Sequence, residues 1–157
     1  MFAVVEDDAH RAVALDNHLA HAGIQIDVDA MARGKAFFEV GAADHSPDHA
    51  LFAYAADDQG SEVYRLYVKD LATGVVLEGP AQSTTGDFTW SPDSRWLFWI
   101  WRDDNGRPAK IFRRPARGGT GDDVLVYEEP DDGFFLSIGR TSSDAYIVIG
   151  AGDHETS

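Results

Sequence analysis

The feature that most constrains this chain is a short phrase that it repeats. The phrase reads HSPDHALFAY at residues 45–54 and WSPDSRWLFW at residues 90–99, and a fainter copy, TSSDAYIVI, occupies residues 141–149. In each copy a tight polar turn, Ser-Pro-Asp or Ser-Ser-Asp, precedes an apolar run rich in aromatic and β-branched residues. A run of this kind, bounded by turn residues, predicts a buried β-strand. The copies begin about 45 and about 50 residues apart, so the chain is expected to repeat one β-rich unit.

Further apolar runs, separated by turn residues, surround each copy of the phrase. In the first unit they occupy residues 37–40, 51–55, 63–68 and 75–77; in the second, residues 88–90, 96–101, 110–113 and 124–127; in the third, residues 134–138 and 146–149. Four strands joined by hairpins form a propeller blade, and blades recur at about 40–50 residues. The sequence therefore predicts a mainly β fold, a partial β-propeller of about two and a half four-stranded antiparallel blades. The blade units are expected at residues 36–79, 86–129 and, incompletely, 134–157.

Residues 1–28 follow a different pattern and are expected to form a short helical lead-in. Its predicted parts are an apolar strand at residues 2–5, an amphipathic helix over residues 9–22 and an alternating strand over residues 24–28. The partial propeller is then expected over residues 29–157, beginning with a linker at residues 30–35.

The first part of this lead-in weakly resembles the start of a response-regulator receiver domain. The sequence VVEDD at residues 4–8 is similar to the end of the first receiver strand, and the resemblance covers only residues 1–26. No central phosphoacceptor strand and no switch Thr and Lys follow it, so the resemblance does not carry the receiver's activity over. A signalling chimera that uses this receiver-like head is the weakest of three functional hypotheses.

Composition narrows the classes of partner. The formal net charge is −14, from 27 acidic and 13 basic residues, which disfavours a nucleic-acid backbone or an anionic membrane as a partner. No apolar run approaches the roughly 18 residues of a membrane span, and the N-terminus lacks the basic region of a signal peptide. A cytoplasmic protein is therefore expected. The chain has no cysteine, which excludes disulfides and thiolate metal sites.

One cluster carries residue types that bind metals, and it coincides with the first copy of the phrase. Its members are Asp44, His45, Asp48 and His49. Such side chains can bind Zn²⁺ when they share a helix face, but Pro47 and the repeat place the cluster on a turn. The corresponding turn at Asp93 has no histidine, so we expect Asp48 and Asp93 to cap their turns by accepting backbone N–H bonds.

Two other groups of residues are interpreted as structural. Paired acids at residues 57–58, 103–104, 122–123 and 131–132 lack the alternating ligands and distal Glu of a calcium loop, and most are expected to be solvated hairpin corners. They could also give a parent protein an acidic surface suited to basic peptides. The aromatic residues Phe88, Trp90, Trp96, Phe98, Trp99 and Trp101 are expected to form the core between blades. Stacking on single-stranded nucleic acid would require a basic groove as well.

The chain carries no signature of a nucleophilic serine. A nucleophile elbow requires Gly-x-Ser-x-Gly, and this pentapeptide is missing from the sequence. The serine-rich stretches at residues 82–86 and 141–143 fall in predicted turns. No catalytic, cofactor-binding or metal-binding residue is therefore assigned, and no cofactor is expected.

Several longer phrases point to one family. They lie at residues 57–64, 68–74, 88–94, 126–132 and 140–143. From about Asp27 to Ser157 the chain resembles the propeller domain of the prolyl oligopeptidase family of serine peptidases, in its oligopeptidase B (protease II) branch. The resemblance implies a seven-bladed propeller that covers an α/β-hydrolase domain and restricts its access to peptides, which this branch cleaves after basic residues. It also implies that this chain is a truncated, non-catalytic propeller fragment, inactive alone, with peptide substrates only in the full-length parent.

A second hypothesis is a free-standing interaction module without peptidase activity. An arc of fewer than three blades leaves strand edges and apolar blade faces uncovered, and such surfaces drive association. We therefore expect a homo-oligomer that assembles through exposed blade edges.

Overall fold

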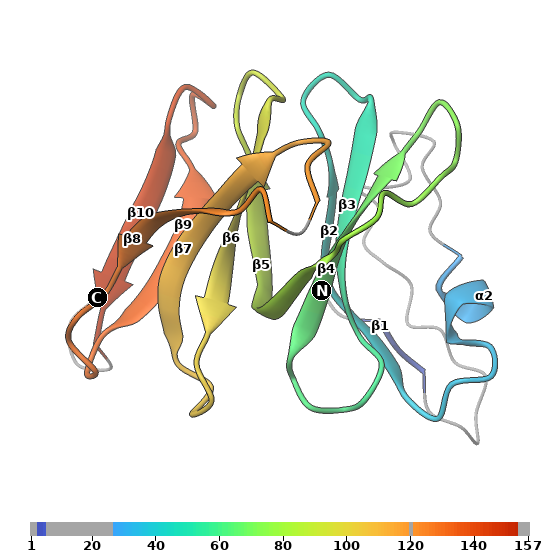
Figure 1. Ribbon diagram of the computed structural model, residues 1–157, viewed down its shortest axis with the longest axis horizontal. Helices are drawn as coiled ribbons and strands as arrows, with labels where there is room; N and C mark the ends of the chain where they lie inside the picture. Colours follow the sequence, from blue (N-terminus) through green and yellow to red (C-terminus); the bar gives the residue numbers. More distant parts are fainter. Residues whose placement is uncertain (1–2, 6–26, 120, 154–157) are drawn as a thin grey trace.

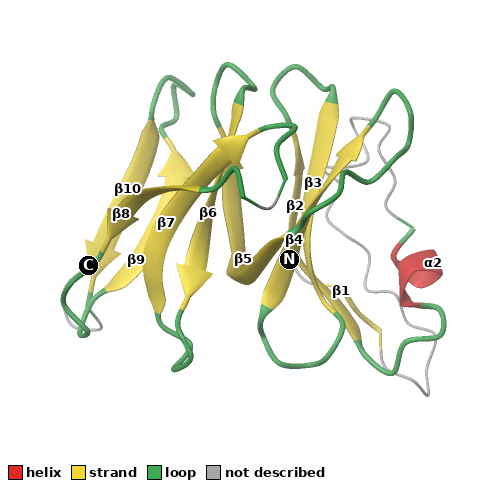
Figure 2. Ribbon diagram, in the orientation of Figure 1, coloured by secondary structure: helices red, strands yellow, loops and turns green. Residues whose placement is uncertain are grey.

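The computed structural model describes residues 3–5, 27–119 and 121–153, which form an arc of stacked antiparallel β-strands (Figures 1 and 2). The elements in chain order are β1 (Ala3–Val5), α2 (Val28–Ala32), β2 (Phe38–His45), β3 (Leu51–Asp57), β4 (Tyr64–Asp70), β5 (Ala81–Trp90), β6 (Trp96–Arg102), β7 (Pro108–Pro115), β8 (Val124–Glu128), β9 (Phe135–Arg140) and β10 (Ile147–Gly152). The mainly β, propeller-like fold predicted from the repeat is confirmed.

Hydrogen bonding links β1 to β8 in chain order into one antiparallel sheet, while β9 and β10 form a separate hairpin. The strand β5 belongs to two units. Its first part pairs with β4, at Leu66↔Ala81, and its second part pairs with β6, at Phe88↔Trp99. Between them the backbone of Gly86 has a φ of 97°, which a side chain would disfavour. The sheet therefore turns from the first blade into the second within one strand.

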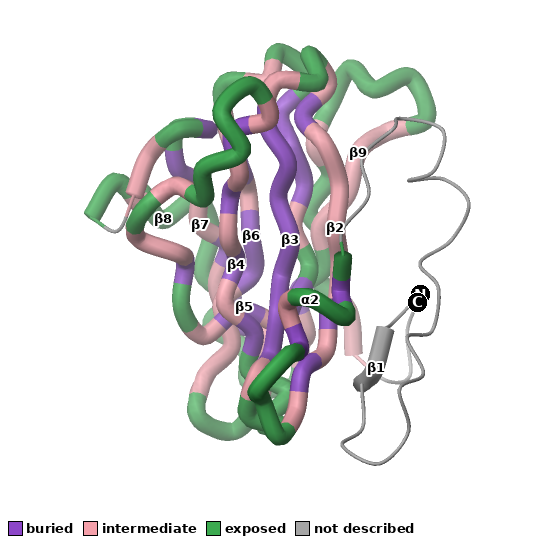
Figure 3. Tube along the Cα trace, turned by 90° about the vertical axis from the view of Figure 1, so that its right-hand side faces the viewer, coloured by how far each residue is buried: buried purple, intermediate pink, exposed green. Residues whose placement is uncertain are grey.

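The core consists of layers between the blades. Between the first and second blades lie Leu51, Leu66, Trp90, Leu97 and Trp99, and between the second and third lie Ile100, Ile111 and Leu136. The strand β3 is buried along its whole length, as Figure 3 shows, because the second blade covers one of its faces and the layer that includes α2 covers the other. The prediction of an inter-blade core is confirmed for residues 97–101: Leu97 and Trp99 pack toward the first blade, and Phe98 and Ile100 toward the third. It is wrong for Trp96, which lies outside both layers with Arg113 over its ring at 4.4 Å.

The first blade also buries its outer face. Residues of α2, β2 and β3 form this third layer, with Val28, Phe38, Val40 and Tyr54 all buried. Burial of apolar area at about 25 cal/mol per Å² is the main stabilising contribution of all three layers.

Four local predictions differ from the structure. Val28, expected at the end of a strand, begins α2 because the side chain of Asp27 caps the helix by accepting a 2.8 Å bond from the Ala30 N–H. The expected linker therefore begins after Ala32 rather than at residue 30. Residues 75–77, expected as the fourth strand of the first blade, form only the isolated bridge Lys69↔Val76. The strand predicted at residues 37–40 extends as β2 to His45.

The remaining predictions for the lead-in lie mostly outside the described residues. The apolar run at residues 2–5 contains β1, which pairs antiparallel with β2. The predicted helix over residues 9–22 and the strand residues 24–26 are not among the described residues. The division of the chain at residue 28 stays a prediction.

Candidate functional site

The recurring phrase forms the same hydrogen-bonded turn in the first and second blades. The Ser46 hydroxyl donates to Asp48 Oδ1 at 2.6 Å and accepts a 3.0 Å bond from the Leu51 N–H. In the second copy the Ser91 hydroxyl donates to Asp93 at 2.6 Å and accepts from the Trp96 N–H at 2.9 Å. Both turns are thus closed by one serine and one aspartate, as expected for capping residues.

The third copy has this turn, but one residue earlier than the phrase suggests. Thr141 takes the place of the first serine, since its hydroxyl accepts a 3.3 Å bond from the Tyr146 N–H. Ser143 stands where the aspartate stands in the other copies, 3.0 Å from the Thr141 hydroxyl. Asp144 takes the position with φ near 54°, which His49 and Ser94 occupy in the other turns. The alignment of Ser-Ser-Asp with Ser-Pro-Asp was therefore wrong by one residue.

The three turns lie along one edge of the stack, at the top in Figure 1, and the first two contact each other. The Asp48 N–H donates to the Ser94 hydroxyl at 2.9 Å, which joins the first turn to the second. A guanidinium nitrogen of Arg140 in β9 lies 3.8 Å from the Asp44 carboxylate in β2, a contact from the third blade to the first. The bond between the first two turns and the contact of Arg140 with Asp44 therefore link the three blades along this edge.

The four residues of the candidate metal cluster, Asp44, His45, Asp48 and His49, contact different partners. The rings of His45 and His49 lie 4.3 Å apart at 47°, and His45 Nδ1 lies 3.1 Å from the Ser46 carbonyl oxygen. The Asp48 carboxylate bonds Ser46 and the Ala50 N–H, and these bonds lower the pKa of Asp48. Within the described ranges, no group of three or more His, Cys, Asp or Glu side chains is placed to hold a metal ion.

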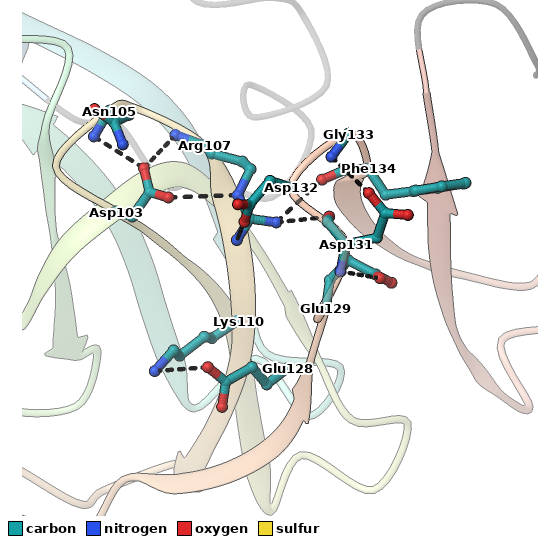
Figure 4. Close-up of polar contacts among 10 residues, drawn as sticks. All are labelled: Asp103, Asn105, Arg107, Lys110, Glu128, Glu129, Asp131, Asp132, Gly133 and Phe134. Carbon is teal, nitrogen blue, oxygen red and sulfur yellow. Dashed lines mark hydrogen bonds and ion pairs between the residues drawn. The ribbon is translucent and has the colours of Figure 1, made fainter.

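In all four paired acids, an aspartate accepts N–H groups of its own turn, as Asp131 does from Gly133 at 2.9 Å. Asp57, only 2% exposed, accepts bonds from the N–H groups of Gln59, Gly60 and Glu62 at 2.7–3.1 Å. Asp103 accepts 2.9 Å bonds from the N–H groups of Asn105 and Arg107, and the Arg107 bond is the main cause of the lowered pKa of Asp103 (Figure 4). Asp122 accepts a 3.0 Å bond from the Gly119 N–H. The expectation of solvated hairpin corners is therefore wrong for Asp57, which is a buried capping group.

A buried arginine joins the first two blades. Arg114, 3% exposed, donates two 2.7 Å bonds to the Asp123 carboxylate and one 2.6 Å bond to the Gly79 carbonyl oxygen. Asp123 also accepts a 3.2 Å bond from the Trp99 indole N–H. Sequence reasoning missed this network, because Arg114 follows the strand predicted at residues 110–113 and lies between Arg113 and Pro115, a context that gives no sign of a buried charge.

A second arginine, Arg107, joins the second blade to the loop before the third (Figure 4). Its guanidinium donates to the carbonyl oxygens of Asp131 and Phe134, at 3.0 and 3.4 Å. It also forms ion pairs with Asp103 at 3.4 Å and with Asp132 at 3.1 Å. Because Arg107 contacts both ends of the loop that leads into β9, it fixes where the third blade begins.

A cavity of about 180 Å³ opens on the outer face of the first blade, beside α2. Its lining includes Met31, Phe38, Tyr54 and Tyr67, with Lys35 and Asp58 paired at 3.6 Å at its rim. Tyr54 and Tyr67 stack with ring centroids 5.2 Å apart, and burial raises the pKa of Tyr54 to about 12. The cavity is side-chain-sized and combines aromatic walls with a charged rim.

The serine-rich stretches show no catalytic arrangement. Thr84 and Gly86 lie within β5, where the Thr84 hydroxyl donates to the Tyr64 carbonyl oxygen at 3.2 Å. Over the part of the chain that the structure describes, no serine hydroxyl bonds a histidine ring, which a Ser-His-Asp triad would require. The described helix is also too short to cross a membrane, and no other candidate span is found in the described ranges.

Comparison with known proteins agrees with this geometry. Residues 5–157 match the family described as prolyl oligopeptidase, N-terminal β-propeller domain. Dipeptidyl aminopeptidase BI of Pseudoxanthomonas mexicana is 35% identical over 127 residues, which is 80% of this chain and 18% of that protein. Protease 2 of Moraxella lacunata is 28% identical over 136 residues, covering 85% of this chain and 20% of that protein.

Solved structures of oligopeptidase B share the fold. The Leishmania major enzyme superposes with a TM-score of 0.76 at 29% identity, over 81% of this chain and 18% of that one. The Trypanosoma brucei enzyme, in its closed form with covalently bound antipain, superposes with a TM-score of 0.72 at 30% identity, over 82% of this chain and 18% of that one. The chain thus spans about a fifth of the length of its curated relatives. With its stacked four-stranded units and this match over nearly all of its length, the chain belongs to the prolyl oligopeptidase N-terminal β-propeller domain family.

Proposed function

We propose that this chain is a non-catalytic part of the propeller of an oligopeptidase B-like serine peptidase. The parent enzyme would hydrolyse peptides after basic residues, at a hydrolase domain that lies outside these 157 residues. The observation that carries the proposal is the stack of blades, which superposes on two oligopeptidase B structures at 29–30% identity.

The architecture suits a role in limiting which molecules reach the hydrolase domain of the parent enzyme. Blades that bury both faces and are joined by Arg114, Arg107 and the repeated turns form a stiff wall. A stiff wall around a chamber admits flexible peptides and excludes folded proteins. The net charge of −14 would also attract basic peptides over long range.

The first test asks whether the isolated chain cleaves peptides. The purified chain is incubated with an Arg-containing chromogenic peptide, with and without a serine-directed inhibitor. We expect no release of the chromophore, because the described residues hold no nucleophile activated by a base. Cleavage that the inhibitor abolishes would refute the non-catalytic assignment.

The second test asks whether these blades work within a complete enzyme. Residues 27–157 replace the homologous segment of the Leishmania major oligopeptidase B, and the unmodified enzyme is the control. We expect kcat/KM for a short Arg peptide to stay within about tenfold of the control, and a folded Arg-containing protein to remain intact. A well-folded chimera that digests the folded protein would exclude the gating role.

Specificity needs a separate measurement, since one relative is named a dipeptidyl aminopeptidase. In the same chimera, an Arg peptide with a blocked N-terminus is compared with a dipeptide substrate that has a free N-terminus. Preference for the blocked Arg peptide supports oligopeptidase B-type cleavage. Preference for the free dipeptide would assign these blades to a dipeptidyl aminopeptidase instead.

The second candidate function is an interaction module that assembles through exposed blade edges. It is favoured by the large apolar side chains on β10 and beside it, of which Tyr146 is 70% exposed and Val148 49% exposed. Strands that present apolar side chains at an unpaired edge tend to pair with another chain. This candidate predicts self-association of the isolated chain.

A further inference from the structure

The outer edge of the second blade is formed by β8 (Val124–Glu128), and it differs from the other strands of the large sheet. β8 ends the strand order and pairs only with β7 among the described strands. One row of its backbone N–H and C=O groups is therefore available to a further strand.

The side chains of β8 are unusually apolar for such a position. All five residues are exposed, and four in a row are large and apolar: Val124 at 50%, Leu125 at 46%, Val126 at 41% and Tyr127 at 39%. Edge strands are commonly protected by lysine, proline or inward-pointing charges. Apart from Glu128, which pairs with Lys110, β8 contains no charge and no proline, so Val124–Tyr127 suit a bound strand with apolar side chains.

The two ends of β8 are acidic. Residues 118–134 contain six acidic and no basic side chains. Three of these acids are neutralised from β7 and the hairpin before it, through Lys110–Glu128 at 3.1 Å, Arg114–Asp123 at 2.7 Å and Arg107–Asp132 at 3.1 Å. Asp122 before the strand and Asp131 after it are exposed, and neither forms an ion pair with a described residue. Their carboxylates accept only the N–H groups of Gly119 and Gly133 (Figure 4 for Asp131).

This charge pattern disfavours a second copy of β8 as the occupant. In an antiparallel pair centred on Val126, Asp122 of one copy would lie opposite Pro130 and beside Asp131 of the other, at both ends. Like charges this close across a strand pair repel each other, and no described residue forms an ion pair with either carboxylate. A complementary strand instead needs an apolar middle and basic ends.

We propose that the β8 edge binds an extended peptide segment as a ninth strand of the large sheet. The segment has about five residues of high β-propensity, matching the roughly 17 Å length of β8, and lysine or arginine at both ends. Backbone hydrogen bonds to β8 hold the segment, and its basic ends face Asp122 and Asp131. The site lies on the outside of the blade and requires no hydrolase domain, so it goes beyond the proposed function.

The test measures binding of a labelled peptide, KKTVTVTKK, to the purified full chain by fluorescence anisotropy. We expect saturable binding that is at least about tenfold weaker for the charge-reversed peptide EETVTVTEE. It should also weaken at least about tenfold when ionic strength rises from roughly 0.05 to roughly 0.5 M, because the end contacts are exposed charges. Amide chemical shifts of Val124–Glu128 should change most when the peptide is added.

Two variants separate β8 from the other apolar edge. Val126→Lys should weaken binding at least about tenfold, by placing a positive charge at the middle of the edge. Val148→Lys, on the exposed strand β10, is the matched control and should change affinity less than about twofold. Circular dichroism checks that both variants fold. Absence of binding at about 1 mM peptide, equal binding of both peptides, or unchanged affinity of folded Val126→Lys would each overturn the proposal.

Discussion

At the scale of single residues, Tyr64 shows how two blades depend on one side chain. Its ring lies between two glycines, Gly41 in β2 and Gly86 in β5. A Cβ atom would lie 3.0 Å from the ring at Gly41 and 3.2 Å at Gly86. Burial, followed by a hydrogen bond from its hydroxyl to Glu39, raises the pKa of Tyr64. The ring therefore occupies space that only glycine leaves free.

Gly41→Ala tests this close packing. We expect the free energy of unfolding to fall by about 1–3 kcal/mol, because the new methyl group overlaps the Tyr64 ring. Denaturant unfolding measures the change. Gly139→Ala is the control, since nothing lies within 4 Å of its added Cβ, and it should be close to neutral. Equal stability of both variants would show that Tyr64 has room to move.

The turn aspartates give a pH dependence at the same scale. Bonds from the Ser91 hydroxyl and then from Arg95 lower the pKa of Asp93 from 3.8 to about 2. A carboxylate whose pKa is lowered by folding stabilises the folded state above its unfolded pKa, and the effect disappears as pH falls through about 2. The stability gap between the wild type and Asp93→Asn should therefore be constant above pH 4 and close toward pH 2 in denaturant titrations. Asp104→Asn, on an exposed turn, is the control, and a gap that persists at pH 2 would contradict this explanation.

At the scale of elements, local patterns predicted the hairpins but not the connections between blades. The turns at Asp48 and Asp93 could be predicted because their capping bonds are made within a few residues. The third turn was misplaced by one residue because threonine and serine can both supply the closing hydroxyl. The continuity of β5 and the Arg114 network could not be predicted, since Thr84 of β5 bonds Tyr64, 20 residues away, and Arg114 bonds Gly79, 35 residues away. No site residue was assigned from the sequence, and that assignment stays a prediction.

The Arg114 network makes a prediction about how blades are joined. Arg114→Met should lower the free energy of unfolding by about 3 kcal/mol or more, because it leaves Asp123 and the Gly79 carbonyl without their partner in a buried setting. Arg95→Met is a matched control: its ion pair with Asp93 is also 2.7 Å long, but the Arg95 side chain is 77% exposed. Exposed pairs contribute less than about 1 kcal/mol. Similar losses in the two variants, measured by denaturant unfolding, would show that burial does not determine the strength of this contact.

At the scale of the whole molecule, the arc has two unlike ends. On the first blade, α2 covers the apolar face except at the cavity beside Tyr54. At the other end, β9 packs against the second blade, while β10 presents exposed apolar residues and one edge that pairs with no other described strand. In a closed propeller, neighbouring strands and blades would cover such surfaces. The isolated chain should therefore associate through β10, whereas the acidic ends of β8 disfavour pairing of two copies there.

Self-association through β10 can be tested by sedimentation velocity and light scattering over a range of concentrations. We expect oligomers at tens of micromolar, roughly, because pairing of two β10 edges buries Val148 and Ile149 and satisfies backbone hydrogen bonds. Val148→Lys should raise the concentration needed for association at least about tenfold, since two like charges would then lie close together at the contact. Val75→Lys is the control, because Val75 is 58% exposed in a turn away from β10. A wild-type chain that stays monomeric throughout this range, or variants that weaken association equally, would show that the edge of β10 does not join the copies. The interaction-module hypothesis would then lose the observation that favours it.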